Sequence, residues 1–71
     1  MITVNIRETD EFIKLGQALK KAGLVESGAE AKEVIVDGLV TVNKEVDNRR
    51  GRKLYDGDIV VFNGMEIKIE K

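Results

Sequence analysis

The fold is decided by residues 12–42, which have the sequence FIKLGQALKKAGLVESGAEAKEVIVDGLVTV. In its first part apolar residues recur at spacings of three and four, as on one helix face: Phe12, Leu15, Leu19 and Ala22. This pattern predicts a helix from about Glu11 to Ala22. Thr9 or Asp10 is suited to cap its start, and Gly23 is suited to follow its end.

A second helix is indicated by Ser27-Gly28-Ala29-Glu30, which has the pattern of a capping box. We expect the Ser27 hydroxyl to accept a hydrogen bond from the Glu30 amide, and the Glu30 side chain to return to the Ser27 amide. Gly38 is expected just after the end of this helix. Residues 23–26 then join the two helices into a tight pair.

The other segments have the composition of strands. Residues 2–6 alternate apolar and polar side chains, which predicts a strand with one buried face. Further strands are expected at 39–42, 53–55, 59–62 and 65–70, and residues 45–46 follow the first of these after a turn. Asn43-Lys44 is expected as a turn, and Asn63-Gly64 is the strongest hairpin signal in the chain, a type I′ candidate. The first strand is expected to pair with the last.

Together these elements predict an α+β fold in the order β-α-α-β-β-β-β, with two packed N-terminal helices and a small bent antiparallel sheet. The chain has 71 residues, which is room for one small domain, so we interpret residues 1–71 as a single domain. The longest apolar run has four residues, Ile59–Phe62, and the N-terminal segment lacks the pattern of a signal peptide. We therefore expect a cytoplasmic protein with no membrane association.

The composition also excludes several kinds of catalysis. The chain has no cysteine and no histidine, so it forms no disulfide and has neither thiolate nor imidazole ligands for a metal. The same absence excludes Cys–His and Ser–His–Asp mechanisms. We expect no metal, no cofactor and no enzymatic activity.

Charge is segregated along the chain. The net charge is −1, but residues 43–53 carry five basic and two acidic side chains, so this window is +3 and the rest of the chain is −4. Within 49–53 every residue except Gly51 is basic: Arg49, Arg50, Arg52 and Lys53. Arginine forks match phosphate oxygens, so this cluster is the first candidate for phosphate binding. The alternative is a solvated surface loop.

Other candidates are weaker. The first helix has a polar and basic face that consists of Lys14, Gln17, Lys20 and Lys21, and such faces commonly serve solubility. We expect Ser27 to act as a helix cap rather than as a contact to a ligand. Asp56 and Asp58 are two residues apart, as acid–base or metal-binding carboxylates can be, but Asp-Gly-Asp before an apolar strand is ordinary turn chemistry. Tyr55 could stack on a base or belong to the core.

Residues 12–62 resemble the RNA-binding domain named after ribosomal small-subunit protein four, the S-four domain, whose fold is also called the alpha-L motif. The resemblance lies in Lys14-Leu15-Gly16-Gln17-Ala18-Leu19, Gly23-Leu24, Ser27, Ala31-Lys32, Ile35, Gly38, Val40, Val42-Asn43 and Gly57-Asp58. The segment Asn48–Tyr55 is also similar to the short stand-alone bacterial S-four proteins of the YaaA and YbcJ type. The family often has glycine where Lys44 stands.

The resemblance implies binding of structured RNA, often ribosomal, through one face of the domain. Carried over to this chain, that face comprises Lys14, Gln17, Ser27, Lys32, Asn43 and Lys44, extended by the Arg49–Lys53 cluster. Larger relatives fuse the domain to catalytic domains, and nothing of those is present in these residues.

We therefore expect a monomeric, non-enzymatic protein that binds structured RNA, with ribosomal RNA or ribosome precursors as the target and ribosomal proteins as further partners. The Arg49–Lys53 cluster is expected to hold phosphates. Because aromatic residues are few, we expect recognition of backbone and shape rather than base stacking. An alternative is a protein-interaction module that docks an acidic partner through the same loop. A further alternative is an enzyme that uses Asp56 and Asp58.

Overall fold

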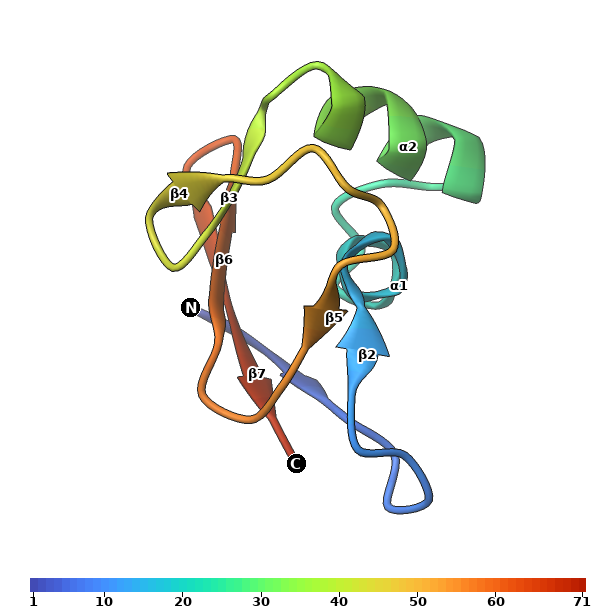
Figure 1. Ribbon diagram of the computed structural model, residues 1–71, viewed down its shortest axis with the longest axis vertical. Helices are drawn as coiled ribbons and strands as arrows, with labels where there is room; N and C mark the ends of the chain where they lie inside the picture. Colours follow the sequence, from blue (N-terminus) through green and yellow to red (C-terminus); the bar gives the residue numbers. More distant parts are fainter.

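Two short helices pack beside a five-stranded sheet, and the computed structural model describes all residues from 1 to 71 (Figure 1). The elements in chain order are β1 (Ile2–Asn5), β2 (Ile13–Lys14), α1 (Leu15–Lys21), α2 (Gly28–Val36), β3 (Val40–Val42), β4 (Glu45–Val46), β5 (Lys53–Leu54), β6 (Ile59–Phe62) and β7 (Met65–Glu70). The predicted α+β class is confirmed. Neither helix is long or apolar enough to span a bilayer.

The main sheet has the strand order β1-β7-β6-β3-β4. The expected pairing of the first strand with the last is confirmed, but β1 and β7 are parallel, with Ile2 opposite Ile67. The sheet is therefore mixed rather than wholly antiparallel. A parallel pair needs a long crossover, and both helices lie in the chain between these two strands. No tight turn sets the relative direction of β1 and β7, so local sequence signals did not indicate it.

The start of the first helix was predicted wrongly. Helix α1 begins at Leu15, and the two residues before it form β2, which pairs antiparallel with β5. In this ribbon Ile13 lies opposite Leu54, and Lys14 lies opposite Lys53. The apolar spacing around Phe12 fits a helix, but the chain there is extended because it pairs with β5. Since β5 is distant in the sequence, the spacing alone did not reveal this pairing.

One hydrophobic core joins the helices, the ribbon and the sheet. The side chains with no exposed surface are Leu15, Ala18 and Leu19 of α1, Ala31 and Ile35 of α2, Leu54 of the ribbon, and Val40, Val60, Ile67 and Ile69 of the sheet. Because α1 supplies three of them within five residues, its position is fixed by the core as well as by its ends.

The predicted cap of the second helix is confirmed at Ser27, whose Oγ accepts a hydrogen bond from the Glu30 amide at 3.1 Å. The Glu30 carboxylate accepts from the Glu26 amide at 2.8 Å, one residue before the amide that we expected. Gly38 follows the helix with φ +77°, in the left-handed region that favours glycine.

The two hairpin turns have the same geometry but different residues. Asn63-Gly64 has φ values of +52° and +77°, which fits the predicted type I′ turn. Asn43-Lys44 between β3 and β4 has φ values of +51° and +74°. Asparagine adopts this conformation readily, whereas a lysine there is strained by its Cβ.

Replacing Lys44 by Gly should raise the free energy of unfolding by roughly 0.5–1 kcal/mol, because the left-handed strain at this position exceeds the flexibility that glycine adds. Urea denaturation measures this difference. Lys44→Ala is the matched control, because it removes the same charge but keeps the Cβ. Equal stability of the two variants would contradict the strain at Lys44.

Candidate functional site

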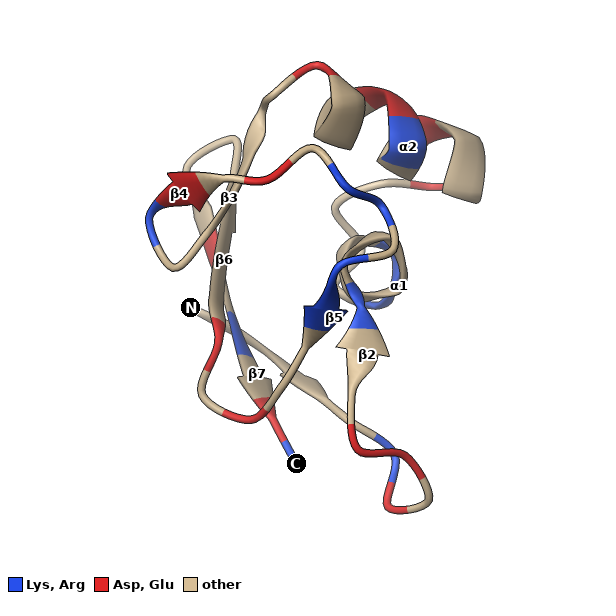
Figure 2. Cartoon of the chain, viewed as in Figure 1, with Lys and Arg blue, Asp and Glu red and all other residues tan.

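A shallow groove lies where α1, the start of α2 and the loop before β5 meet. It is lined by Lys14, Gly16, Gln17, Lys20, Gly28, Ala31, Arg50 and Gly51, and we call it the basic groove. Three of these residues carry positive charge and none carries negative charge. None of the three cations takes part in an ion pair. In Figure 2 blue segments gather around α1, β2 and β5, whereas α2 carries both red and blue segments.

The loop before β5 is attached directly to the first turn of α1. The Leu15 amide donates to the Arg52 carbonyl at 2.9 Å, and the Gly16 amide donates to the Arg50 carbonyl at 3.1 Å. These amides have no partner inside the helix, so the loop carbonyls satisfy them. The loop therefore both starts the helix and lies against it (Figure 1).

Gly16 leaves the space that Arg50 occupies. A Cβ on Gly16 would lie 2.9 Å from Cγ of Arg50, closer than side chains tolerate, and 3.7 Å from the Arg50 carbonyl oxygen. The glycine costs helix propensity of about 1 kcal/mol relative to alanine. In return it lets the aliphatic part of Arg50 pack on α1.

Asp47 organises the rest of the loop. Its side chain is only 6% exposed, and its two oxygens accept hydrogen bonds from Arg49 and Arg52. Arg49 donates through Nε at 3.1 Å to one oxygen and through a terminal nitrogen at 2.8 Å to the other, and its amide donates at 3.0 Å. Arg52 adds a fourth hydrogen bond at 2.6 Å. All side-chain polar atoms buried in this region have partners.

This arrangement shifts the ionisation of the groups involved. The Arg49 guanidinium, assisted by Arg52, holds the pKa of Asp47 well below its usual range, although burial acts in the opposite direction. The hydrogen bond with Asp47 raises the pKa of Arg49 in turn. The basic loop is thus a structured turn with one internal carboxylate, and two of its arginines are already paired.

The structure brings several of the predicted residues together. Lys14, Gln17, Lys20 and Arg50 line the basic groove, and Lys53 lies directly opposite Lys14 in the ribbon. Gln17 also accepts a hydrogen bond from the Lys14 amide at 3.1 Å, which satisfies another backbone group at the start of α1. Arg49 and Arg52 border this region but are bound to Asp47.

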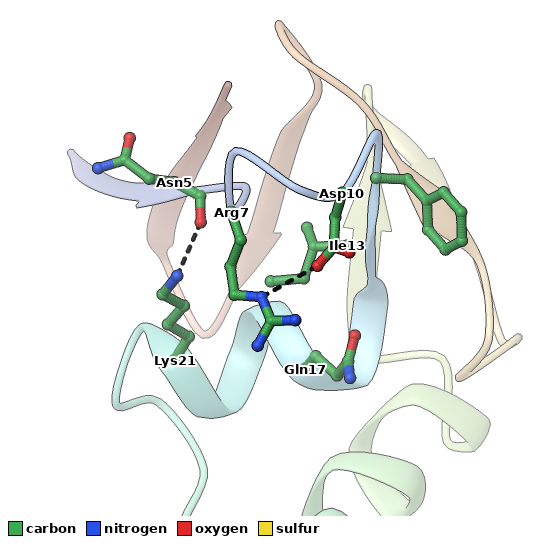
Figure 3. Close-up of a pocket in the computed structure, with 7 residues that line it drawn as sticks. Asn5, Arg7, Asp10, Ile13, Gln17 and Lys21 are labelled. Atoms are coloured by element: carbon green, nitrogen blue, oxygen red, sulfur yellow. Dashed lines mark hydrogen bonds and ion pairs between the residues drawn. The ribbon is translucent and has the colours of Figure 1, made fainter.

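Lys21 lies outside the basic groove. Its ammonium donates to the Asn5 carbonyl at 2.8 Å, in a separate hollow beside the Arg7–Asp10 ion pair (Figure 3). Gln17 lies between the two hollows and lines both. Lys21 therefore ties α1 to β1.

The other predicted residues are also separate from the groove. Lys32 lines a different hollow on α2, beside Glu33 and Asp37. Lys44 lies in the turn between β3 and the edge strand β4, and Figure 1 shows this hairpin and α1 at opposite sides of the view. Ser27 uses its hydroxyl as the helix cap.

The Asn43 side chain also forms hydrogen bonds within the fold. Its side-chain amide donates to Asp58 at 3.1 Å, and its side-chain oxygen accepts from the Ile59 amide at 3.0 Å. The β3–β4 turn is thereby tied to the start of β6. Asp58 also accepts from the Tyr55 amide at 2.8 Å, so the Asp56–Asp58 segment is held as a turn, as its sequence indicated.

Sequence reasoning missed Asp47 and the β2–β5 ribbon. Asp47 precedes the arginines by two residues, and an acid at the edge of a basic run was the available signal for an internal pair. The expected strand at 53–55 is present as β5, but β2 has only two residues and its partner is distant in the sequence, so their pairing had no local signal.

An open groove with unpaired cations, on a small α+β fold with two leading helices, is typical of a module that binds a polyanion. Residues 4–70 match the family model described as the S4 domain. The chain therefore belongs to the S4 domain family, as the resemblance of residues 12–62 implied.

Two named relatives are similar over most of the chain. One is the probable ribosome maturation protein RlbA of Bacillus subtilis, 54% identical over 54 residues that cover 76% of each chain. Another is the putative RNA-binding protein YbcJ of Escherichia coli, 37% identical over 57 residues, or 80% of this chain and 81% of the relative.

A solved structure has the same fold. It is the solution structure of YbcJ from E. coli, described as revealing an αL motif involved in RNA binding. The matched region includes 100% of this chain and 89% of the YbcJ chain. It superposes with a TM-score of 0.74 at 32% sequence identity. The predicted alpha-L arrangement of helices and sheet is thereby confirmed.

Asp47→Asn should lower the free energy of unfolding by about 1.5–3 kcal/mol near neutral pH, because charge-assisted hydrogen bonds are lost inside the loop. The pKa of Asp47 is lower in the folded than in the unfolded chain, where it is about 3.9. Its contribution is therefore complete above about pH 5 and is lost as the pH falls below about 4 through the folded value.

Urea denaturation of both proteins from about pH 7 down to about pH 2 tests this. The difference between wild type and Asp47→Asn should shrink over the acidic part of the series. Asp37→Asn, at an exposed residue without an ion pair, is the control and should change stability by less than about 0.5 kcal/mol. A difference that stays constant across the pH series would contradict the assigned role of Asp47.

Proposed function

We propose that this protein is a non-enzymatic module that binds structured RNA, with ribosomal RNA or ribosome precursors as the target, through the basic groove and the adjoining ribbon. The observation that carries the proposal is a set of unpaired cations on one surface: Lys14, Lys20, Arg50 and Lys53. The names of the relatives, a ribosome maturation protein and an RNA-binding protein, support the same class of ligand.

The proposed mechanism is electrostatic attraction with a fixed geometry. The four unpaired cations hold phosphates, and the groove between α1 and the loop sets their spacing. The Asp47 network keeps the loop in one conformation, so little conformational entropy is lost when RNA binds. Arg49 is largely exposed and borders the site, but its fork is already shared with Asp47. This division of roles differs from the expectation that Arg49, Arg50, Arg52 and Lys53 all hold phosphates.

Binding of a labelled RNA hairpin at increasing salt should give a slope of log K against log salt of roughly −3 to −4, since about four phosphates are neutralised. Lys20→Gln and Arg50→Gln should each make the slope shallower by about 1. Lys32→Gln and Lys44→Gln are matched controls, because they remove one exposed cation outside the groove. A slope near zero for the wild type would overturn the mechanism.

Crosslinking in cells, followed by sequencing of the attached RNA, should recover defined ribosomal RNA sites with the wild type and lose them with an Arg50→Glu, Lys20→Glu variant. The alternative of an acidic protein partner makes a different prediction. A complex that survives nuclease treatment and yields no enriched RNA would show that the groove docks protein instead.

A further inference from the structure

The β2–β5 ribbon has an outer face that the phosphate mechanism uses only in part. Ile13 and Leu54 pack toward the core, while Lys14 and Lys53, opposite each other, are exposed. Phe12 directly precedes β2 and Tyr55 directly follows β5, and their ring centroids are 6.1 Å apart. We call these four residues the ribbon face. It combines two cations and two aromatic rings beside the basic groove.

The lysine pair is unfavourable without a ligand. Like charges directly opposite in an antiparallel pair repel each other, and neither Lys14 nor Lys53 has an acidic partner. The Lys53 ammonium lies 4.9 Å from the centre of the Phe12 ring, a cation–π contact that holds it on this face. A phosphate bound between the two lysines would remove the repulsion.

Tyr55 has the open aromatic surface on the ribbon face. It is 48% exposed, whereas Phe12 is half-buried and has Lys53 over its ring. The two rings are tilted by 55° and so are not stacked on each other. Tyr55 is therefore a platform on which a planar group can stack, with Phe12 supporting it from the side.

The acidic turn after Tyr55 indicates which part of a nucleotide fits there. Asp56 directly follows Tyr55, and Asp58 lies two residues further on. Asp56 accepts a hydrogen bond from the Lys71 amide at 2.9 Å, and Asp58 accepts one from the Tyr55 amide at 2.8 Å. Their charges disfavour a phosphate beside Tyr55. The two lysines at the other end favour one. This order of charge matches a nucleotide with its uncharged base on Tyr55 and its phosphate toward the groove.

We propose that the ribbon face binds one unpaired nucleobase of the RNA, stacked on Tyr55, with an adjacent phosphate between Lys14 and Lys53. The inference rests on the proposed function and refines it. A base inside a duplex has both faces covered, so the ligand must carry a bulged, flipped or terminal base beside a helical segment. The expectation that backbone and shape alone are recognised is thereby extended by one local stacking contact.

The test compares two labelled RNA hairpins that are identical except for a single bulged purine in one of them. The wild type should bind the bulged hairpin more tightly by about 10-fold, the effect of one stacked base. Tyr55→Phe should keep this preference. Tyr55→Leu retains an apolar side chain beside Phe12 but has no ring, and should bind both hairpins with the affinity of the paired one.

A bulged 2-aminopurine provides a direct readout, because its fluorescence is quenched when it stacks on an aromatic ring. Quenching should occur with the wild type and Tyr55→Phe, and be lost with Tyr55→Leu. Met65→Leu, at an apolar residue of similar exposure on the β6–β7 hairpin, is the control and should change nothing. Circular dichroism of each variant verifies that it is folded.

The outcomes separate this inference from the proposed function. Equal binding of the two hairpins by the wild type, with normal salt dependence and no effect of Tyr55→Leu, would overturn the stacking contact and leave RNA binding standing. Failure of the wild type to bind either hairpin would overturn both.

Discussion

The site depends on one buried carboxylate. Asp47 is nearly inaccessible to solvent, and its four hydrogen bonds from Arg49 and Arg52 hold the basic loop in a single shape. The carbonyls of that loop in turn complete the first turn of α1. Without the acid, the closely spaced arginines would repel one another, and the loop whose carbonyls accept from the first amides of α1 would lose its internal hydrogen bonds. One negative charge thus makes a concentration of positive charge compatible with a stable fold.

Those parts of the fold whose signals are local were predictable. Ser27 as a cap, Gly38 after a helix and Asn63-Gly64 as a hairpin each depend on a few adjacent residues, and the structure contains all three. The β2–β5 pairing and the parallel β1–β7 pair join distant segments. Nothing in the apolar spacing around Phe12 indicates a partner about forty residues away, so the helix was extended too far toward its start.

The candidate site divides in the same way. The basic residues could be recognised in the sequence. The sequence did not show which of their side chains are free of ion pairs. Arg49 and Arg52 have the same composition signal as Arg50, yet two are paired with Asp47 and one lies in the groove. Lys21 differs from Lys20 by one helical position and is turned to the Asn5 carbonyl instead. Counting charges therefore locates the basic region of the sequence. The hydrogen bonds in the structure show which of its cationic side chains remain free to bind a ligand.

The parallel pairing of β1 with β7 also bears on the order in which the molecule assembles. β1 precedes both helices in the chain, and its neighbouring strand β7 follows every other strand of the structure. During translation the apolar face of β1 stays without a sheet partner until β7 has emerged, and such long-range closure slows folding. The helices and the basic loop lie between these strands, so their contacts can form earlier. The main sheet can therefore be completed only after β7 has been synthesised.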